Sequence, residues 1–177
     1  MKSNWKRRYS AYLFDLDGTL VDTAPDIDAA LNFSLTQAGL DTVTEKLTRH
    51  WVGHGSRTLI KEALDHQGAQ REIEPLLKDF IHYYENNIAN HSKPYPHVES
   101  TLATLKDGGA KLAVVTNKLM SLTTLLIREL KLEQYFTSVV CGDSTKFSKP
   151  SPEPVFLAMR NLESNAAESL FVGDSET

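Results

Sequence analysis

Two acidic residues two positions apart, Asp15 and Asp17, follow a short apolar run near the start of the chain. Side chains two apart in extended chain project to the same side, so both carboxylates can face one pocket. Two carboxylates in one pocket repel each other, and the pKa of one rises unless a cation intervenes. Such a separation lets one acid act as a nucleophile or metal ligand while its neighbour transfers protons. Gly18, directly after them, permits a tight turn.

Two other interpretations compete for the segment DLDGT. The simplest is a turn whose two acids are solvated. A calcium loop of the EF-hand type also contains Asp-x-Asp, but Leu20 occupies the position that needs glycine in such a loop. The sequence therefore argues against the calcium loop and leaves the solvated turn as the alternative to a reactive site.

Three further polar segments follow apolar runs, and each holds a group suited to phosphate chemistry. Thr116 and Asn117 offer a hydroxyl and backbone donors that could hold phosphoryl oxygens. Lys149, just before a helix start framed by prolines, is a candidate fixed cation. Asp174 is a candidate ligand for Mg²⁺, which prefers oxygen donors together with substrate phosphate. Taken alone, each is a weak signal that a turn or a surface residue would explain, so their common location matters.

Short apolar segments alternate with helical patterns along much of the chain. Strands are expected at residues 9–15, 110–116, 137–141 and 169–172. Helices are expected between them at residues 97–107, 121–132 and 152–162. This alternation predicts an α/β fold with a Rossmann-like parallel sheet. Because ligands bind at the carboxyl ends of the strands in such sheets, the polar segments described above should meet at one edge.

Residues 22–93 interrupt this alternation with helical patterns and no convincing strand. Helices are expected at about 23–38, 44–51, 56–67 and 72–89. Thr23 and Asp26 predict a capping box at the first of these helices, and Ser56 is expected to cap the third. We therefore expect an α/β core of residues 1–21 and 94–177, interrupted by an all-helical cap domain of residues 22–93. Insertions of this size are usually functional.

A polar turn flanked by glycines lies between two helices of the insert. It consists of His54, Gly55, Ser56 and Arg57. Free backbone amides at the start of the following helix could bind an anion, and the turn could then select the substrate. An ordinary connection between helices explains the turn equally well. Another pair of residues, Trp51 and Tyr84, is expected in the core of the insert rather than stacked on a substrate.

Composition and charge argue against several classes of protein, namely those that bind duplex DNA, carry a signal peptide or span a membrane. The chain of 177 residues has 19 Lys and Arg and 23 Asp and Glu, a formal net charge of −4. This mild acidity argues against a protein that binds duplex DNA through a basic surface. No apolar stretch approaches a signal-peptide core or the roughly 18 residues of a membrane span. With Cys141 as its one cysteine, the chain can form no internal disulfide. We expect a cytoplasmic protein without a nucleic-acid or membrane partner.

Taken together, the motifs DxDGT, TN, KPxPxP and GDS, each at the end of a predicted strand, resemble the haloacid dehalogenase superfamily of aspartate-nucleophile phosphatases. In that superfamily a helical cap is inserted after the first strand. The stretches FDLDGTLVDTAPDI, WVGHGSRTLI, VVTNK and LFVGDS are similar, more closely, to phosphoglycolate phosphatases. The resemblance implies Mg²⁺-dependent hydrolysis of a small phosphorylated metabolite, 2-phosphoglycolate, to glycolate and phosphate, by a monomer or homodimer.

The resemblance implies a different catalytic role for each of the two acids of the first motif. Asp15 attacks phosphorus and becomes an aspartyl-phosphate. Asp17 protonates the leaving alcohol and later deprotonates the hydrolytic water. A halide needs no proton to leave whereas an alkoxide does, so the second aspartate favours phosphate ester hydrolysis over dehalogenation.

The resemblance assigns the remaining motif residues to binding. Thr116 and the backbone of Asn117 bind the phosphoryl group, and Lys149 balances charge between Asp15 and the phosphate. Magnesium is held by Asp15 and Asp174, together with the backbone carbonyl of residue 17. These roles agree with the chemistry, because an anionic nucleophile that attacks a phosphate dianion needs positive charge nearby.

The sequence departs from the family pattern after its last motif. The family usually carries a second acid four residues after the position of Asp174, and here that position lies one residue past Thr177. A further helix and strand are also missing, so we expect a truncated chain whose last strand forms a sheet edge and which binds magnesium more weakly. Two alternatives are an inactive remnant and a sugar phosphomutase similar to β-phosphoglucomutase, which would share both acids of the first motif.

Overall fold

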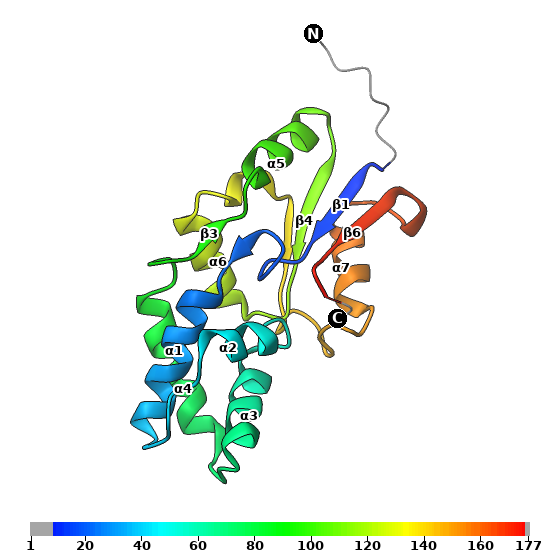
Figure 1. Cartoon of the computed structure of the whole chain (residues 1–177). Helices are drawn as coiled ribbons and strands as arrows, with labels where there is room; N and C mark the ends of the chain where they lie inside the picture. Colours follow the sequence, from blue (N-terminus) through cyan, green and yellow to red (C-terminus); the bar gives the residue numbers. More distant parts are fainter. Residues whose placement is uncertain (1–8, 176–177) are drawn as a thin grey trace.

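A computed structural model describes residues 9–175 of the chain (Figure 1). Its centre is a parallel sheet with the strand order β5–β4–β1–β6. The strands are β1 (Ala11–Phe14), β4 (Lys111–Val115), β5 (Ser138–Val140) and β6 (Ser169–Val172). The four predicted strands are therefore confirmed, three of them with shorter bounds, and so are the α/β class and the Rossmann-like parallel core. Strand β6 lies at one edge of the sheet.

Helices cover both faces of this sheet (Figure 1). Side chains of β1 and β4 alternate between the two faces, as the pleat of a strand requires. Tyr12 and Phe14 pack in one apolar cluster with α5 (Val98–Asp107) and α6 (Met120–Glu129). Ala11 and Leu13 pack in a second cluster with α7 (Glu153–Asn161). Two short 3-10 helices, η1 (Glu133–Tyr135) and η2 (Ala166–Glu168), connect these elements. The runs of apolar residues in β1 and β4 thus reflect burial on both faces.

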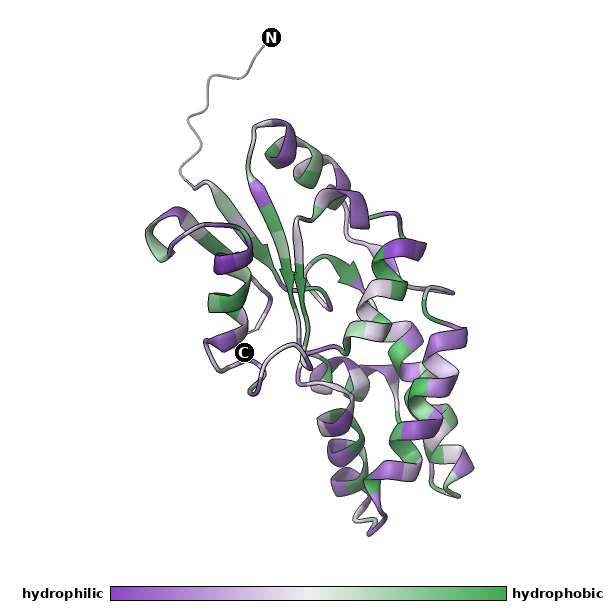
Figure 2. Ribbon diagram, turned by 180° about the vertical axis from the view of Figure 1, so that it is seen from behind, coloured by the Kyte–Doolittle hydropathy of each residue, from purple (hydrophilic) through white to green (hydrophobic). Residues whose placement is uncertain are grey.

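Four helices between β1 and α5 form a separate layer at the carboxyl end of the sheet (Figure 1). They are α1 (Ala24–Gln37), α2 (Glu45–Trp51), α3 (Ser56–Gln67) and α4 (Ile73–Asn86), which we call the cap. Hydrophobic residues line the strands and the inward helix faces, while hydrophilic residues gather on the outer faces (Figure 2). The apolar cluster of the cap is continuous with the cluster under α5 and α6. The cap therefore rests on the core through packed apolar side chains.

A two-stranded antiparallel ribbon, absent from the prediction, joins the cap to the core. Strand β2 (Val21–Asp22) pairs with β3 (Lys93–Pro94). Each strand has two residues, which is too short for any alternation of polar and apolar residues to reveal it. The division of the chain at residues 21/22 and 93/94 stays a prediction, and the ribbon lies at both boundaries. No helix within residues 9–175 is long and apolar enough to cross a membrane.

The predicted capping box at the start of α1 is wrong. Thr23 makes no side-chain cap; its hydroxyl donates to Asp17 at 2.7 Å. The carboxylate of Asp26 accepts hydrogen bonds from the backbone N–H groups of His91 and Ser92, at 3.0 and 2.7 Å. Thr23 therefore connects the start of α1 to the first motif, and Asp26 connects it to the distant segment 91–92, instead of closing the helix start locally.

Two other helix ends also differ from the prediction. Ser56 is not the N-cap of α3, because Gly55 occupies that place with a φ of 87°, a conformation that glycine adopts without strain. Helix α6 ends at Glu129, three residues before the predicted end. Lys131 turns into the left-handed region, and the N–H of Leu132 bonds to the carbonyl of Ile127 at 2.7 Å. The apolar spacing continues beyond the helix because Leu132 is still buried.

Candidate active site

Asp15 and Lys149 form a buried ion pair at the carboxyl end of β1. The carboxylate of Asp15 accepts a hydrogen bond from Lys149 Nζ at 2.6 Å and another from the Leu16 N–H at 2.7 Å. The two residues are 3% and 6% exposed. Burial raises the pKa of Asp15, and the ammonium of Lys149 opposes that rise. The pair thus places an anionic oxygen and its balancing cation at the sheet edge where ligands bind in α/β folds.

Asp17 lies beside this pair and is held by two donors. Its Oδ1 accepts hydrogen bonds from Thr23 Oγ1 at 2.7 Å and from Lys118 Nζ at 2.9 Å. Lys118 follows β4 and is 7% exposed. Its ammonium also lies over the ring of Tyr84, 4.6 Å from the ring centroid. Burial lowers the pKa of Lys118, but the charge of Asp17 and the adjacent Tyr84 together outweigh it, so the net shift of the pKa is upward and the lysine stays charged.

Asn117 connects three segments around the site. Its Nδ2 donates to the carbonyl of Gly53 in the cap at 3.0 Å and to the carbonyl of Lys149 at 3.1 Å. Its Oδ1 accepts from the N–H of Lys149 at 2.9 Å. Thr116 before it is buried, and its hydroxyl accepts from the N–H of Lys118 at 3.2 Å. The Asn117 side chain therefore positions Lys149 and links the cap to the core.

Gly142, two residues after β5, packs against the segment 116–118, and we expect Gly142→Ala to damage both stability and the site. A Cβ at Gly142 would lie 2.4 Å from the carbonyl oxygen of Asn117, which is backbone and cannot rotate away. Residues 116–118 would have to shift, at a cost of about 1–3 kcal/mol. Thermal unfolding checks this. Gly108→Ala, where the nearest atom is 3.3 Å away, is the control with a smaller expected loss. An unchanged melting temperature for Gly142→Ala would contradict the packing described here.

Asp174 approaches the first motif from the end of β6. Its Oδ1 accepts a hydrogen bond from Thr19 Oγ1 at 2.8 Å. Gly18 has a φ of 81°, and a Cβ there would lie 2.5 Å from Oδ2 of Asp174. The carboxylate thus packs directly on the turn that carries Asp15 and Asp17, and any side chain larger than hydrogen at position 18 would displace it.

The chemistry of these donors fits Mg²⁺. Within residues 9–175, no three His, Cys, Asp or Glu side chains gather as a metal cluster. Magnesium does not need one, because it is usually held by one or two carboxylates, with waters and substrate phosphate filling the other positions. The carboxylates of Asp15 and Asp174 and the backbone carbonyl of residue 17 are hard oxygen donors of that kind. Zinc would instead favour nitrogen and sulfur ligands.

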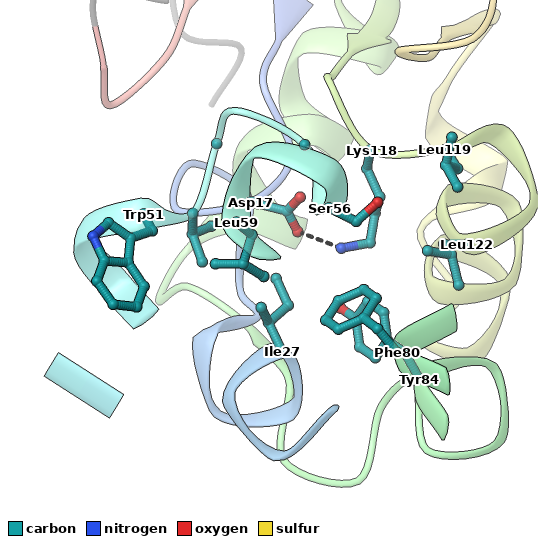
Figure 3. A pocket seen from close by; sticks show the side chains of 13 residues that line it. Asp17, Ile27, Trp51, Ser56, Leu59, Phe80, Tyr84, Lys118, Leu119 and Leu122 are labelled. Atoms are coloured by element: carbon teal, nitrogen blue, oxygen red, sulfur yellow. Dashed lines mark hydrogen bonds and ion pairs between the residues drawn. The ribbon is translucent and has the colours of Figure 1, made fainter. Parts of the chain in front are cut away.

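A pocket between the cap and the core adjoins Asp17 (Figure 3). Its polar side chains are those of Asp17, Lys118, Tyr84 and Ser56, and Figure 3 shows the first three converging from different elements. The rest of the wall is mostly apolar: Ile27, Trp51, Val52, Gly53, Gly55, Leu59, Phe80, Leu119 and Leu122. The prediction that Trp51 and Tyr84 are buried in the cap is confirmed, but both also line this pocket.

The predicted polar turn of the cap contributes only in part to this pocket. Gly55 and Ser56 line it, whereas His54 and Arg57 do not. Arg57 is exposed and pairs with Glu74 at 2.6 Å on the surface of the cap. That the turn binds an anion stays a prediction, and of its four residues only Gly55 and Ser56 are placed to do so in this pocket.

Sequence reasoning assigned no role to Lys118, and it placed Tyr84 in the cap core alone. The feature of the sequence that could have indicated a role is that Lys118 directly follows Thr116 and Asn117, at the carboxyl end of a predicted strand. Tyr84 carried no such signal, because its ring follows the same apolar spacing as its neighbours on α4. Only tertiary structure shows that the two side chains meet.

Comparison with known proteins identifies the family. The model of the haloacid dehalogenase-like hydrolase family matches residues 12–177. A phosphoglycolate phosphatase of Agrobacterium fabrum is 39% identical over 166 residues, which cover 92% of this chain and 71% of that protein. An N-acetylmuramic acid 6-phosphate phosphatase of Pseudomonas putida is 36% identical, over 94% of this chain and 75% of that protein. The crystal structure of a predicted phosphoglycolate phosphatase from Haemophilus somnus superposes with a TM-score of 0.90 at 31% identity, covering 95% of this chain and 78% of that one. The chain therefore belongs to the haloacid dehalogenase-like hydrolase family, among its phosphoric monoester hydrolases.

Proposed function

We propose that the chain hydrolyses 2-phosphoglycolate to glycolate and phosphate through an aspartyl-phosphate on Asp15. The observation that supports this most is the buried pair of Asp15 and Lys149 beside a second buried acid, Asp17, at the end of β1. The phosphoglycolate phosphatases among the relatives support the choice of substrate. The small pocket under the cap suits a short leaving group.

The first half of the reaction uses both acids. A carboxylate oxygen of Asp15 attacks phosphorus, the new O–P bond forms, and the bond from phosphorus to the ester oxygen breaks. Asp17 gives a proton to that oxygen, so glycolate leaves with a neutral hydroxyl. Thr116 and the N–H of Asn117 bind phosphoryl oxygens, and Lys149 offsets the negative charge that accumulates between nucleophile and phosphate.

The second half regenerates the enzyme. Asp17 takes a proton from a water molecule, which attacks phosphorus and releases inorganic phosphate, and the carboxylate of Asp15 is restored. The two donors on Oδ1 of Asp17, from Thr23 and Lys118, fix the orientation of that carboxylate for both proton transfers. Asp15, Asp174 and the carbonyl of residue 17 would hold Mg²⁺, which when bound supplies positive charge to the phosphoryl oxygens.

Phosphate release from 2-phosphoglycolate, with Mg²⁺ and with a chelator, tests this proposal. We expect release that depends on magnesium and yields free glycolate. Phosphorus NMR of the products separates hydrolysis from a phosphomutase, which would retain phosphate on an organic product. If a folded chain with magnesium releases no phosphate from 2-phosphoglycolate or other small monoesters, the interpretation as an inactive remnant holds instead.

A further inference from the structure

The ion pair with Asp17 does not use all the hydrogen-bond donors of Lys118. An ammonium has three N–H donors, and Asp17 takes one of them at 2.9 Å. The group is buried and lines the pocket under the cap, whose wall is mostly apolar. In such surroundings water competes weakly, so an anion that reaches Lys118 is bound more strongly than it would be at the surface.

Tyr84 gives an independent indication of a ligand at the same place. Its side chain is 1% exposed, and the proton of its hydroxyl finds no acceptor among the described residues. A buried hydroxyl whose proton has no acceptor lowers the stability of the fold, and a ligand that accepts this hydrogen bond would explain why a tyrosine stands here. Burial raises the pKa of this hydroxyl to about 12, which leaves it neutral and able to donate at physiological pH. It lines the pocket beside Lys118 (Figure 3).

The positions of Asp17 and Lys118 indicate where the far end of the leaving group lies. Lys118 touches Asp17 on the side of the pocket. A leaving group that runs from phosphorus at Asp15, past the proton donor Asp17, therefore brings its far end toward the ammonium of Lys118.

We propose that Lys118 and Tyr84 bind a carboxylate on the leaving group of the substrate and so select acidic over neutral two-carbon phosphate esters. This specificity rests on the proposed phosphatase function. Lys118 supplies the charge, the Tyr84 hydroxyl donates a hydrogen bond, and Ser56 at the start of α3 closes the pocket from the cap. The selection then comes from Lys118, in the segment after β4, and from Tyr84 on α4, more than from the exposed residues of the cap turn.

Binding to the Asp15→Asn chain tests the proposal, because that variant cannot turn the ligand over. Calorimetry with Mg²⁺ compares 2-phosphoglycolate with ethyl phosphate, in which a methyl group replaces the carboxylate. We expect a preference for 2-phosphoglycolate of about tenfold or more, the size of one charged hydrogen bond. Adding Lys118→Met should reduce the preference to about twofold, whatever the loss of the ion pair with Asp17 does to the binding that both ligands share. Lys78→Met, an exposed lysine of α4, is the matched control that keeps the preference.

Tyr84→Phe separates binding from folding. Removing a hydroxyl whose proton has no acceptor should raise the melting temperature of the ligand-free chain by a few degrees. The same change should reduce the preference for 2-phosphoglycolate about threefold or more. A group with a structural role alone would lower the melting temperature and leave the preference intact, which would overturn its part in the proposal.

Other outcomes also overturn the inference, separately from the proposed function. If Lys118→Met weakens both ligands equally, or leaves the preference unchanged, Lys118 only supports Asp17. If the parent binds both ligands equally or neither, no carboxylate site exists there. The proposed function fails on different evidence, namely absence of phosphate release by the unaltered chain, and the calorimetric ratio can still be measured in that case.

Discussion

Replacing Asp15 with asparagine is expected to lower phosphate release from 2-phosphoglycolate by about 10⁴-fold or more, the scale of losing a covalent nucleophile. The amide cannot form the acyl-phosphate, yet its oxygen can still accept the hydrogen bond that Lys149 now donates at 2.6 Å. The fold should therefore persist while the chemistry stops. Steady-state phosphate release, with thermal unfolding beside it, measures both.

Asp65→Asn is the matched control for this change. Asp65 is an exposed acid of α3 that pairs with Lys61 at 2.7 Å, far from the site in the fold. Its replacement should leave phosphate release within about twofold, since exposed ion pairs contribute little. If Asp15→Asn retained a tenth or more of the activity, another group would be the nucleophile.

Replacing Lys149 with methionine is expected to be the most destabilising single change in the site. The methionine fills similar space but leaves the buried carboxylate of Asp15 without its cation. Breaking a buried pair in this way costs about 3–5 kcal/mol near neutral pH. Phosphate release should also fall severely, because nothing then offsets the charge between Asp15 and the phosphate.

The stability of Lys149→Met should also depend on pH in a defined direction. Burial already raises the pKa of Asp15 in the folded chain, and Lys149 opposes it, so removing the lysine raises it further. An unfolded aspartate has a pKa of about 3.9. The folded state then holds the proton more tightly, so stability falls as pH rises from about 4 through the folded pKa. The variant should therefore lose less stability at pH 5 than at pH 7.5.

Chemical unfolding at the two pH values, without magnesium, measures this effect. The double variant Asp15→Asn/Lys149→Met removes both charges and should recover part of the loss. Lys61→Met, which breaks an exposed pair, is the control with little expected change. Equal losses at both pH values, or no recovery in the double variant, would show that the damage comes from packing and not from an unpaired carboxylate.

The sequence predicts much of the site because its motif residues lie in the segments that follow the predicted strands. Parallel strands bring their carboxyl ends to one edge, so Asp15, Thr116, Lys149 and Asp174 could be grouped without knowledge of any contact. The structure adds the contacts themselves, such as the link from Asn117 to Gly53 and to the backbone of Lys149.

What the sequence could not predict depends on partners far along the chain. Thr23 and Asp26 match a local cap motif, but their side chains bind Asp17 and the segment 91–92 instead. A local pattern cannot show that a distant donor or acceptor offers a better partner. The contact of Lys118 with Tyr84 is of the same kind, because an apolar helical spacing hides a pocket-lining tyrosine among core residues.

Trapping the phosphorylated intermediate shows most directly whether Asp15 carries phosphate during turnover. The chain would be mixed with 2-phosphoglycolate and Mg²⁺, quenched within the first turnovers, and treated with borohydride, which reduces an acyl-phosphate to the alcohol. Peptide mass spectrometry then locates the modified residue. We expect homoserine at position 15 only when substrate and magnesium are both present. Phosphate release without any modification at position 15, or with modification at another acid, would contradict the account.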